Sequence, residues 1–125
     1  MRYLFAAGLI SALGPFSLPV QADELGPGDY GYRHMEYHTR GTVRDVEEKS
    51  GHTCCDKMGE CRATYVNLKE RTAYLDGKWC PIKRDAAIRY DVSLPDEMAM
   101  VCAGSFLDPI TRCPIVYCGA IPPGT

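Results

Sequence analysis

Seven cysteines are the residues of this chain with the most evident chemistry, and three of them, Cys54, Cys55 and Cys61, fall close together. The other four are Cys80, Cys102, Cys113 and Cys118. Neighbouring residues of an extended chain point to opposite sides, so Cys54 and Cys55 favour bonds to two distant cysteines over a bond to each other. Such bridges would close loops of tens of residues and stabilise the fold by roughly 3–4 kcal/mol each. All seven cysteines are therefore candidates for structural disulfides.

An odd number of cysteines cannot pair completely within one chain. Three bridges leave one thiol, which would be buried or would link two chains as a dimer, and spacing alone leaves many connectivities open. Thiol–disulfide exchange is disfavoured because the sequence has no Cys-x-x-Cys. The absence of Cys-x-x-Cys-His likewise excludes covalent attachment of a c-type haem.

Three histidines provide a second possible chemistry. His34 and His38 are four residues apart and would share one face of a helix, and His52 precedes the cysteine cluster. Imidazole and thiolate ligands suit copper or zinc, so these three histidines are candidate ligands of a copper or zinc ion. Structural zinc would require reduced thiols, which an oxidising compartment does not provide, so metal binding is the alternative interpretation and not the preferred one.

The sequence contains neither of two common motifs of hydrolytic enzymes, Gly-x-Ser-x-Gly and His-Glu-x-x-His. The adjacent carboxylates Glu47-Glu48 and Asp96-Glu97 occur where turns are expected, and solvation explains them better than acid–base catalysis does. We therefore expect a non-catalytic protein without a catalytic residue set.

Residues 1–22 have the pattern of a secretory signal peptide. Arg2 is followed by an apolar run to Leu18, and Val20 and Ala22 suit a signal peptidase, with cleavage expected after Ala22. The run is short and interrupted by proline, so we expect no transmembrane segment. Cleavage would remove one positive charge and no acidic residue, which changes the formal charge from −2 to −3. Scattered basic residues argue against nucleic acid as a partner, and we expect a periplasmic or secreted protein in an oxidising compartment.

The mature chain has about one domain's length. We expect residues 23–29, which are acidic and rich in Gly and Pro, to be a flexible leader, and residues 30–125 to be a single disulfide-stabilised domain. A short helix is expected around the two neighbouring histidines, and Gly41 argues against its extension. Residues 45–49 are expected to be a solvated lead into a turn at Ser50-Gly51.

Strand-forming residues dominate the second half of the chain. Strands are expected at 63–68, 72–75 and 79–82, the last two joined by a tight turn at Asp76-Gly77. Alternation of apolar and polar residues from Ile88 to Leu94 predicts a further half-buried strand. Short apolar runs end at Cys102 and Cys118. The predicted fold class is mainly β, a small disulfide-stapled α+β domain with a short N-terminal helix or arm plus antiparallel hairpins.

The tyrosines divide between the two halves of the chain. Most of them belong to hairpins and core, but Tyr30, Tyr32 and Tyr37 precede the cysteine-stapled body and could offer a contact surface, because Tyr is favoured at interfaces.

Several short motifs follow one another in the mature chain. They are His34, Tyr37 and His38; Gly-His-x-Cys-Cys with a later Cys-Arg (His52, Cys54, Cys55, Cys61, Arg62); Tyr-x-Asp-Gly-x-Trp (Tyr74 to Trp79); and a late cysteine before Pro-Pro-Gly-Thr (Cys118, Pro122 to Thr125). In this order they resemble an uncharacterised family of small exported bacterial proteins. The resemblance implies little about activity. Cys80 and Cys113 look like additions to that pattern, which implies that they pair with each other.

The sequence thus predicts an exported, non-catalytic binding or accessory module of the cell envelope, with an unknown protein or envelope component as its partner. Bridges are expected from the cluster 54–61 to the strands that end at Cys102 and Cys118. The alternative is a periplasmic copper- or zinc-binding protein that uses His34, His38 and His52.

Overall fold

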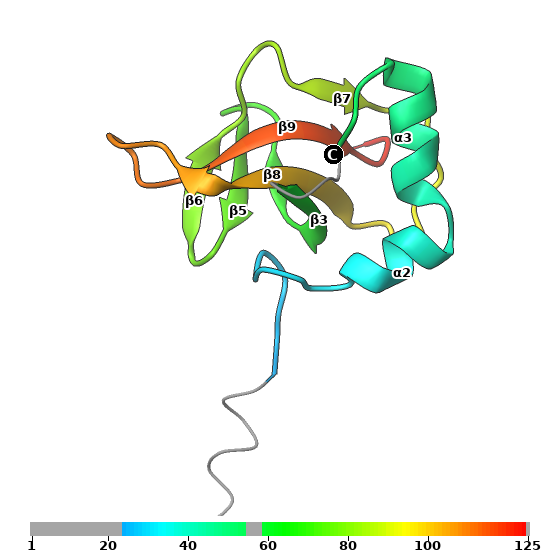
Figure 1. Cartoon of the computed structure of the whole chain (residues 1–125), viewed down its shortest axis with the longest axis horizontal. Helices are drawn as coiled ribbons and strands as arrows, with labels where there is room; N and C mark the ends of the chain where they lie inside the picture. The colour runs from blue at the N-terminus through cyan, green and yellow to red at the C-terminus, as the bar shows by residue number, and fades with distance from the viewer. Residues whose placement is uncertain (1–23, 55–58, 125) are drawn as a thin grey trace, which may run out of the picture.

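The computed structural model describes residues 24–54 and 59–124 (Figure 1). The elements in chain order are α2 (His34–Thr39), α3 (Thr42–Ser50), β3 (Gly59–Thr64), β4 (Val66–Asn67), β5 (Thr72–Leu75), β6 (Lys78–Pro81), β7 (Ala87–Arg89), β8 (Ala99–Leu107) and β9 (Pro114–Ala120). The expected fold class is confirmed: this part of the chain is mainly β, with short helices at its N-terminal end and antiparallel hairpins.

Three layers make up the domain, and a four-stranded sheet in the order β3-β8-β9-β7 lies in the middle. Helices α2 and α3 lie on one side of the β8–β9 pair, and a three-stranded sheet in the order β4-β5-β6 lies on the other (Figure 1). Successive residues of a strand point to opposite faces. Accordingly Met100 and Cys102 of β8 belong to the helix-side core, whereas Val101 and Ala103 belong to the hairpin-side core.

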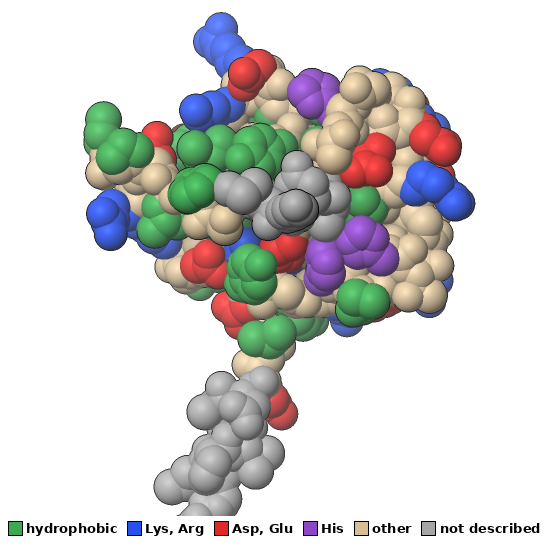
Figure 2. All heavy atoms as spheres, viewed as in Figure 1, with side chains coloured by type: hydrophobic (Ala, Val, Ile, Leu, Met, Phe, Trp, Pro, Cys, Tyr) green, Lys and Arg blue, Asp and Glu red, His purple; other side chains and the backbone are tan. Residues whose placement is uncertain are grey.

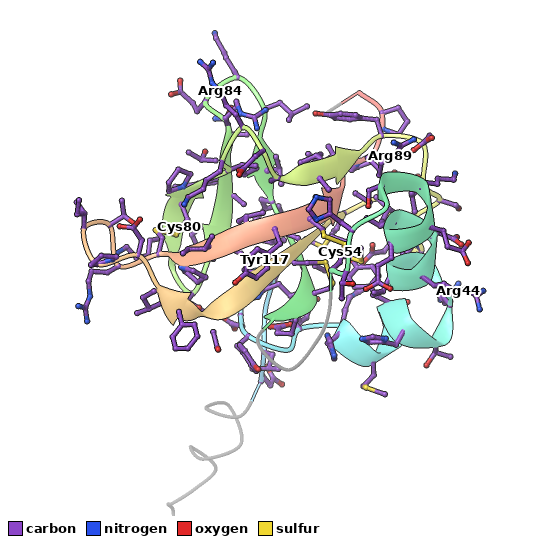
Figure 3. All side chains as sticks on the ribbon, turned by 45° about the horizontal axis from the view of Figure 1, so that its top comes forward. Arg44, Cys54, Cys80, Arg84, Arg89 and Tyr117 are labelled. Atoms are coloured by element: carbon purple, nitrogen blue, oxygen red, sulfur yellow. A yellow bond between two sulfur atoms is a disulfide. The ribbon has the colours of Figure 1, made fainter. Side chains whose placement is uncertain are left out.

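Three disulfides connect the described residues: Cys54–Cys118, Cys61–Cys102 and Cys80–Cys113. The first two link the cysteine cluster to β9 and β8, as expected, and the pairing of Cys80 with Cys113 is also the one expected. In Figure 3, Cys80 and Cys54 lie toward opposite ends of β9. The seventh cysteine, Cys55, lies outside the described residues. The domain is therefore held by one bridge within the central sheet and one on either side of it.

The helical part of the chain is longer than expected. As expected, the helix that carries His34 and His38 ends before Gly41, at Thr39. Gly41 then occupies the N-cap position of a second helix, α3, with a positive φ of 79°, a conformation that glycine adopts without strain. Val43 and Val46 are three residues apart, so both lie on the face of α3 that packs into the core, and both are buried. The expectation that residues 45–49 form only a solvated connection was wrong, because burial of these two valines stabilises a second helix.

The strand expected from Ile88 to Leu94 is much shorter in the structure. Only β7 (Ala87–Arg89) forms there, and it pairs with β9 in parallel, not in a hairpin. The chain then turns at Asp91, whose carboxylate binds Arg89 and whose carbonyl accepts a hydrogen bond from Lys49. Val92 is buried in the helix-side core from an irregular segment. The alternating pattern thus reflects the packing of Val92 and Leu94 against the helix-side core and not continued strand pairing.

The hairpin predictions are confirmed. Strands β5 and β6 pair with Tyr74 opposite Trp79, and the turn between them places Asp76 and Gly77 at positive φ, as a tight primed turn requires. The strand expected at 63–68 is divided into the end of β3 and the short β4. Strand β3 begins at Gly59, inside the cysteine cluster, where the sequence predicted disulfides but no strand.

The N-terminal segment is part of the body and not separate from it. Tyr37 is fully buried in the helix-side core and Tyr32 packs against that core, so the expected N-terminal tyrosine surface is wrong for these two; Tyr30 is exposed. Within the expected leader, Gly28 is buried, and its N–H donates to the carbonyl of Ala63. The expected signal peptide, residues 1–22, lies outside the described residues. Among the residues that are described, no helix is long and apolar enough to cross a membrane.

Candidate functional site

The histidines expected as metal ligands lie in two places. His34 and His38 of α2 have ring centroids 4.6 Å apart, and Nδ1 of His34 is 2.9 Å from the carbonyl oxygen of Cys61. His52 lies elsewhere and lines a cleft that Lys83 also lines. Figure 2 likewise shows histidine side chains in two separate areas. Within residues 24–54 and 59–124, no group of three or more His, Cys, Asp and Glu side chains is placed to hold a metal ion.

A buried ionic network on β3 is the feature that sequence reasoning missed. Arg62 is only 1% exposed, and its Nη1 donates to the carbonyl of Gly28 at 2.9 Å and to Oδ1 of Asp76 at 3.0 Å. Its Nε lies 3.1 Å from Oε2 of Glu60 but forms no hydrogen bond there. Buried charges are rare unless paired. The signal in the sequence was the alternation of Glu60, Arg62 and Thr64 along a strand whose other face is apolar.

This network ties the N-terminal segment to the hairpin. Glu60 accepts a hydrogen bond from the N–H of Gly31 at 2.8 Å, and the ring of Tyr30 covers the guanidinium of Arg62 at 5.4 Å. The carbonyl of Gly28 also accepts from the N–H of Asp76, in the turn of the β5–β6 hairpin. A Cβ at Gly28 would lie 2.5 Å from the carbonyl oxygen of Tyr74, so only glycine fits at this junction.

The solvent side of the three-stranded sheet carries a row of aromatic rings. Ala73 and Leu75 of β5 point into the core, so Tyr74 between them points outward, opposite Trp79 of β6. Tyr65 completes the row. The ring centroids of Tyr65 and Tyr74 are 6.5 Å apart, and those of Tyr74 and Trp79 are 5.4 Å apart. Tyr65 is 54% exposed and Trp79 is 51% exposed. We call Tyr65, Tyr74 and Trp79 the aromatic face.

The position of the aromatic face is held from both sides. The hydroxyl of Thr64 donates to the carbonyl of Tyr74, and Lys78, next to Trp79, donates to the carbonyl of Thr111 at 2.8 Å. The Cys80–Cys113 bridge adds a covalent link beside Trp79. The β8–β9 loop that receives these contacts exposes Ile110 at its tip, and Figure 2 shows hydrophobic side chains gathered mainly on the hairpin side of this view.

Two clefts open on the surface of the described residues. One, of about 440 Å³, is lined by Val92, Ser93, Leu94, Glu97, Pro122, Pro123 and Gly124. The other, of about 290 Å³, is lined by His52, Thr53, Lys83, Asp85, Ala86, Ile115, Val116 and Tyr117. Only the larger one is within the size range common for small-molecule sites, roughly 300–1,000 Å³.

Tyr37 and Asp91 are among the groups with a shifted pKa. Burial raises the pKa of the Tyr37 phenol, and the charge of Asp96 adds to that effect. The hydrogen bond from Arg89 lowers the pKa of Asp91. Neither group lines a cleft or belongs to the aromatic face, so these shifts bear on stability and not on a reaction.

Comparisons with protein-family models, with curated proteins and with solved structures find no match to this chain.

Proposed function

We propose that this protein is an exported, non-catalytic binding module of the cell envelope and that the aromatic face is its contact surface. The observation that carries the proposal is the row of three aromatic rings on the solvent side of a sheet whose other side is core. Tyr and Trp supply large, rigid and amphipathic contact area, and they are enriched at the centre of protein interfaces.

Cross-strand aromatic pairs also stabilise hairpins, by roughly 0.2–1 kcal/mol each, and this is the alternative explanation of the row. Stabilisation of the hairpin does not explain why Tyr65 and Trp79, the two outer rings of the row, are about half exposed. It is also unnecessary here, because the hairpin is already held by Arg62, Thr64 and the Cys80–Cys113 bridge. An exposed aromatic row on a rigid support is the arrangement expected of a binding surface.

Export is supported by the three disulfides, because such bonds persist in oxidising compartments. The expected signal peptide would bring the chain there, and N-terminal sequencing of the exported protein should begin at Asp23.

Binding can be measured with washed bacterial envelopes as the probe. Trp79 is the single tryptophan of the chain, so its emission reports on the aromatic face alone. We expect the mature protein to sediment with the envelopes and its emission to shift to the blue. Tyr65→Ala, which keeps the reporter, should weaken binding about tenfold or more.

Tyr90→Ala is the matched control, because Tyr90 is 52% exposed, close to the value for Tyr65, but lies after β7. It should bind as the wild type does. The proposal fails if Tyr65→Ala and Trp79→Ala bind normally, or if Tyr90→Ala loses as much binding as they do.

A second candidate function, copper or zinc binding, is favoured by the orientation of His34. Its Nδ1 contacts the carbonyl of Cys61, and Oε1 of Glu60 lies 3.6 Å away, so Nε2 is left to act as a ligand beside His38. Titration with Cu²⁺ or Zn²⁺ should show binding that His34→Gln and His38→Gln abolish and that His52→Gln preserves. Equal binding by all three variants would remove this candidate.

A further inference from the structure

We infer that the larger cleft, between residues 92–97 and 122–124, is a binding site for a small organic ammonium ion with an apolar body. This site is separate from the aromatic face, and the inference does not depend on the proposed function. Four observations carry it: the topology of the strands beneath the cleft, the apolar side chains in its lining, the carboxylate of Glu97, which has no ion pair among the described residues, and the backbone conformation of that residue.

The topology opens the cleft. Strands β7 and β9 are parallel, with Arg89 opposite Ala120, and the N–H of Ile121 donates to the carbonyl of Arg89 at 2.9 Å. The chain segments that follow the two strands therefore leave the sheet at the same edge and diverge there. The carboxyl ends of parallel strands are a common place for ligands because diverging connections leave a crevice. Figure 1 shows the C-terminal segment ending at this edge, near α3.

Four of the seven residues that line the cleft, Val92, Leu94, Pro122 and Pro123, have apolar side chains, and the rest of the lining is polar. Val92 is 6% exposed and belongs to the helix-side core, against which Leu94 also packs, so the floor of the cleft is rigid. Pro122 and Pro123 line the other side. Proline adds apolar surface with a fixed φ, so little conformational entropy is lost when a ligand binds. The cleft can therefore bury an aliphatic or aromatic group of modest size.

One charged side chain lines the cleft. Glu97 forms no ion pair within the described residues, whereas its neighbour Asp96 is paired with Arg33 and accepts a hydrogen bond from the N–H of Met98. The other charges nearby are also satisfied, because Asp91 pairs with Arg89 and lies 4.0 Å from Lys49. Ser93 adds a hydroxyl. The unbalanced charge at the cleft is thus negative, which favours a cationic ligand.

The backbone of Glu97 has a φ of 64°, in the left-handed region. A residue with a Cβ is strained there, by roughly 1–2 kcal/mol, and glycine would not be. The contacts of Asp96 hold the turn in place. Arg33, Arg71, Asp76 and Arg112 share this conformation, so the strain at Glu97 supports the assignment only together with the cleft and the carboxylate that lines it.

The experiment compares three probes of similar size in two-dimensional ¹H–¹⁵N NMR: phenethylammonium, 2-phenylethanol and 3-phenylpropionate. Phenethylammonium should shift the amide signals of Ser93, Leu94, Glu97 and Gly124 in a saturable way. The neutral alcohol should bind about fivefold or more weakly, and the carboxylate should not bind. Equal binding of amine and alcohol, preference for the carboxylate, or shifts spread over the whole surface would overturn the inference.

Three substitutions sharpen the test. Glu97→Gln should weaken phenethylammonium binding about fivefold or more. Glu48→Gln, which removes the same charge from an exposed position on α3, should leave it unchanged. Glu97→Gly should raise the melting temperature by about 4 °C, because strain is relieved, while amine binding is lost. If Glu97→Gln and Glu48→Gln behave alike, the amine is attracted only by overall charge and the site does not exist.

Discussion

The two sides of the central sheet are held by different kinds of contact. On the helix side the contact is apolar, with Tyr37, Val46 and Met100 fully buried. On the hairpin side smaller apolar residues such as Ala73 and Ala103 pack beside β8 and β9, and the part next to β3 contains the buried Arg62 network. Apolar contacts tolerate small shifts, whereas a buried charge that loses its partner is strongly unfavourable.

This difference shows how the aromatic face is positioned. The layer that carries it is small, and directional contacts rather than a large core determine where it lies: the two hydrogen bonds of Arg62, the bond from Thr64 to the Tyr74 carbonyl, and one disulfide. The following predictions test this contrast between the two sides.

Arg62→Ala should have the largest effect. It leaves Glu60 buried without its partner, so we expect the free energy of unfolding to fall by roughly 3–5 kcal/mol in urea titration. Arg44→Ala, at an exposed position on α3, is the control and should change it by less than about 0.5 kcal/mol. The double variant Arg62→Met/Glu60→Gln should be more stable than Arg62→Ala. If Arg62→Ala costs less than about 1 kcal/mol, the network does not hold the hairpin layer.

Replacing Cys80 and Cys113 together by Ala should have the second largest effect on the free energy of unfolding. The bridge spans 33 residues, and its loss should cost roughly 3–4 kcal/mol in the chain-entropy model. Hydrogen exchange should accelerate in β4, β5 and β6 before it does in α3. Cys54→Ala/Cys118→Ala is the matched variant and should loosen the helix side first. The same exchange pattern in both variants would contradict the layered account.

Tyr37→Phe should raise the free energy of unfolding, by less than the preceding variants lower it. The Tyr37 hydroxyl is buried without a hydrogen-bond partner among the described residues, so its removal should stabilise the protein by about 1 kcal/mol. Burial raises the pKa of this phenol in the folded state, so the unfolded chain ionises first and stability falls as pH rises above about 10. Urea midpoints between about pH 8 and pH 11 should fall for the wild type and less for Tyr37→Phe. Tyr90→Phe should match the wild type throughout.

Arg89→Ala should have the smallest effect. Its hydrogen bond lowers the pKa of Asp91 in the folded state, so this pair stabilises the fold above the unfolded pKa, about 4, and the contribution disappears as pH falls below it. The two side chains are exposed enough for salt to screen them. The difference in urea midpoint between Arg89→Ala and wild type should be slight at neutral pH, should shrink as pH falls below about 4 and through the lowered folded-state pKa of Asp91, and should be absent in about 1 M NaCl. A large difference that persists in salt would mean that this exposed pair resembles the Arg62 network.

The sequence by itself determined the features that depend on neighbouring residues or on chemistry alone. The Asp76-Gly77 turn and the hairpin around it follow from local backbone preferences. Bonds from the cluster to distant cysteines follow from the adjacency of Cys54 and Cys55, but the spacing left the individual pairings open until the structure showed them, and the Cys80–Cys113 pairing was only an expectation from the resemblance.

Only the tertiary structure decided the features that depend on which segments meet. The sequence placed Tyr37 on the surface, whereas the structure buries it in the helix-side core. The pattern from Ile88 to Leu94 is likewise explained by the burial of Val92 in that core and not by a long strand. Arg62 is buried because Gly28 and Asp76, both distant in sequence, supply its acceptors. The cleft beside Glu97 exists because β7 and β9 are parallel, which needs a long connection and leaves no local signal. Periodicity and turn chemistry act over a few residues, whereas burial and pairing are set by contacts between segments far apart in the chain.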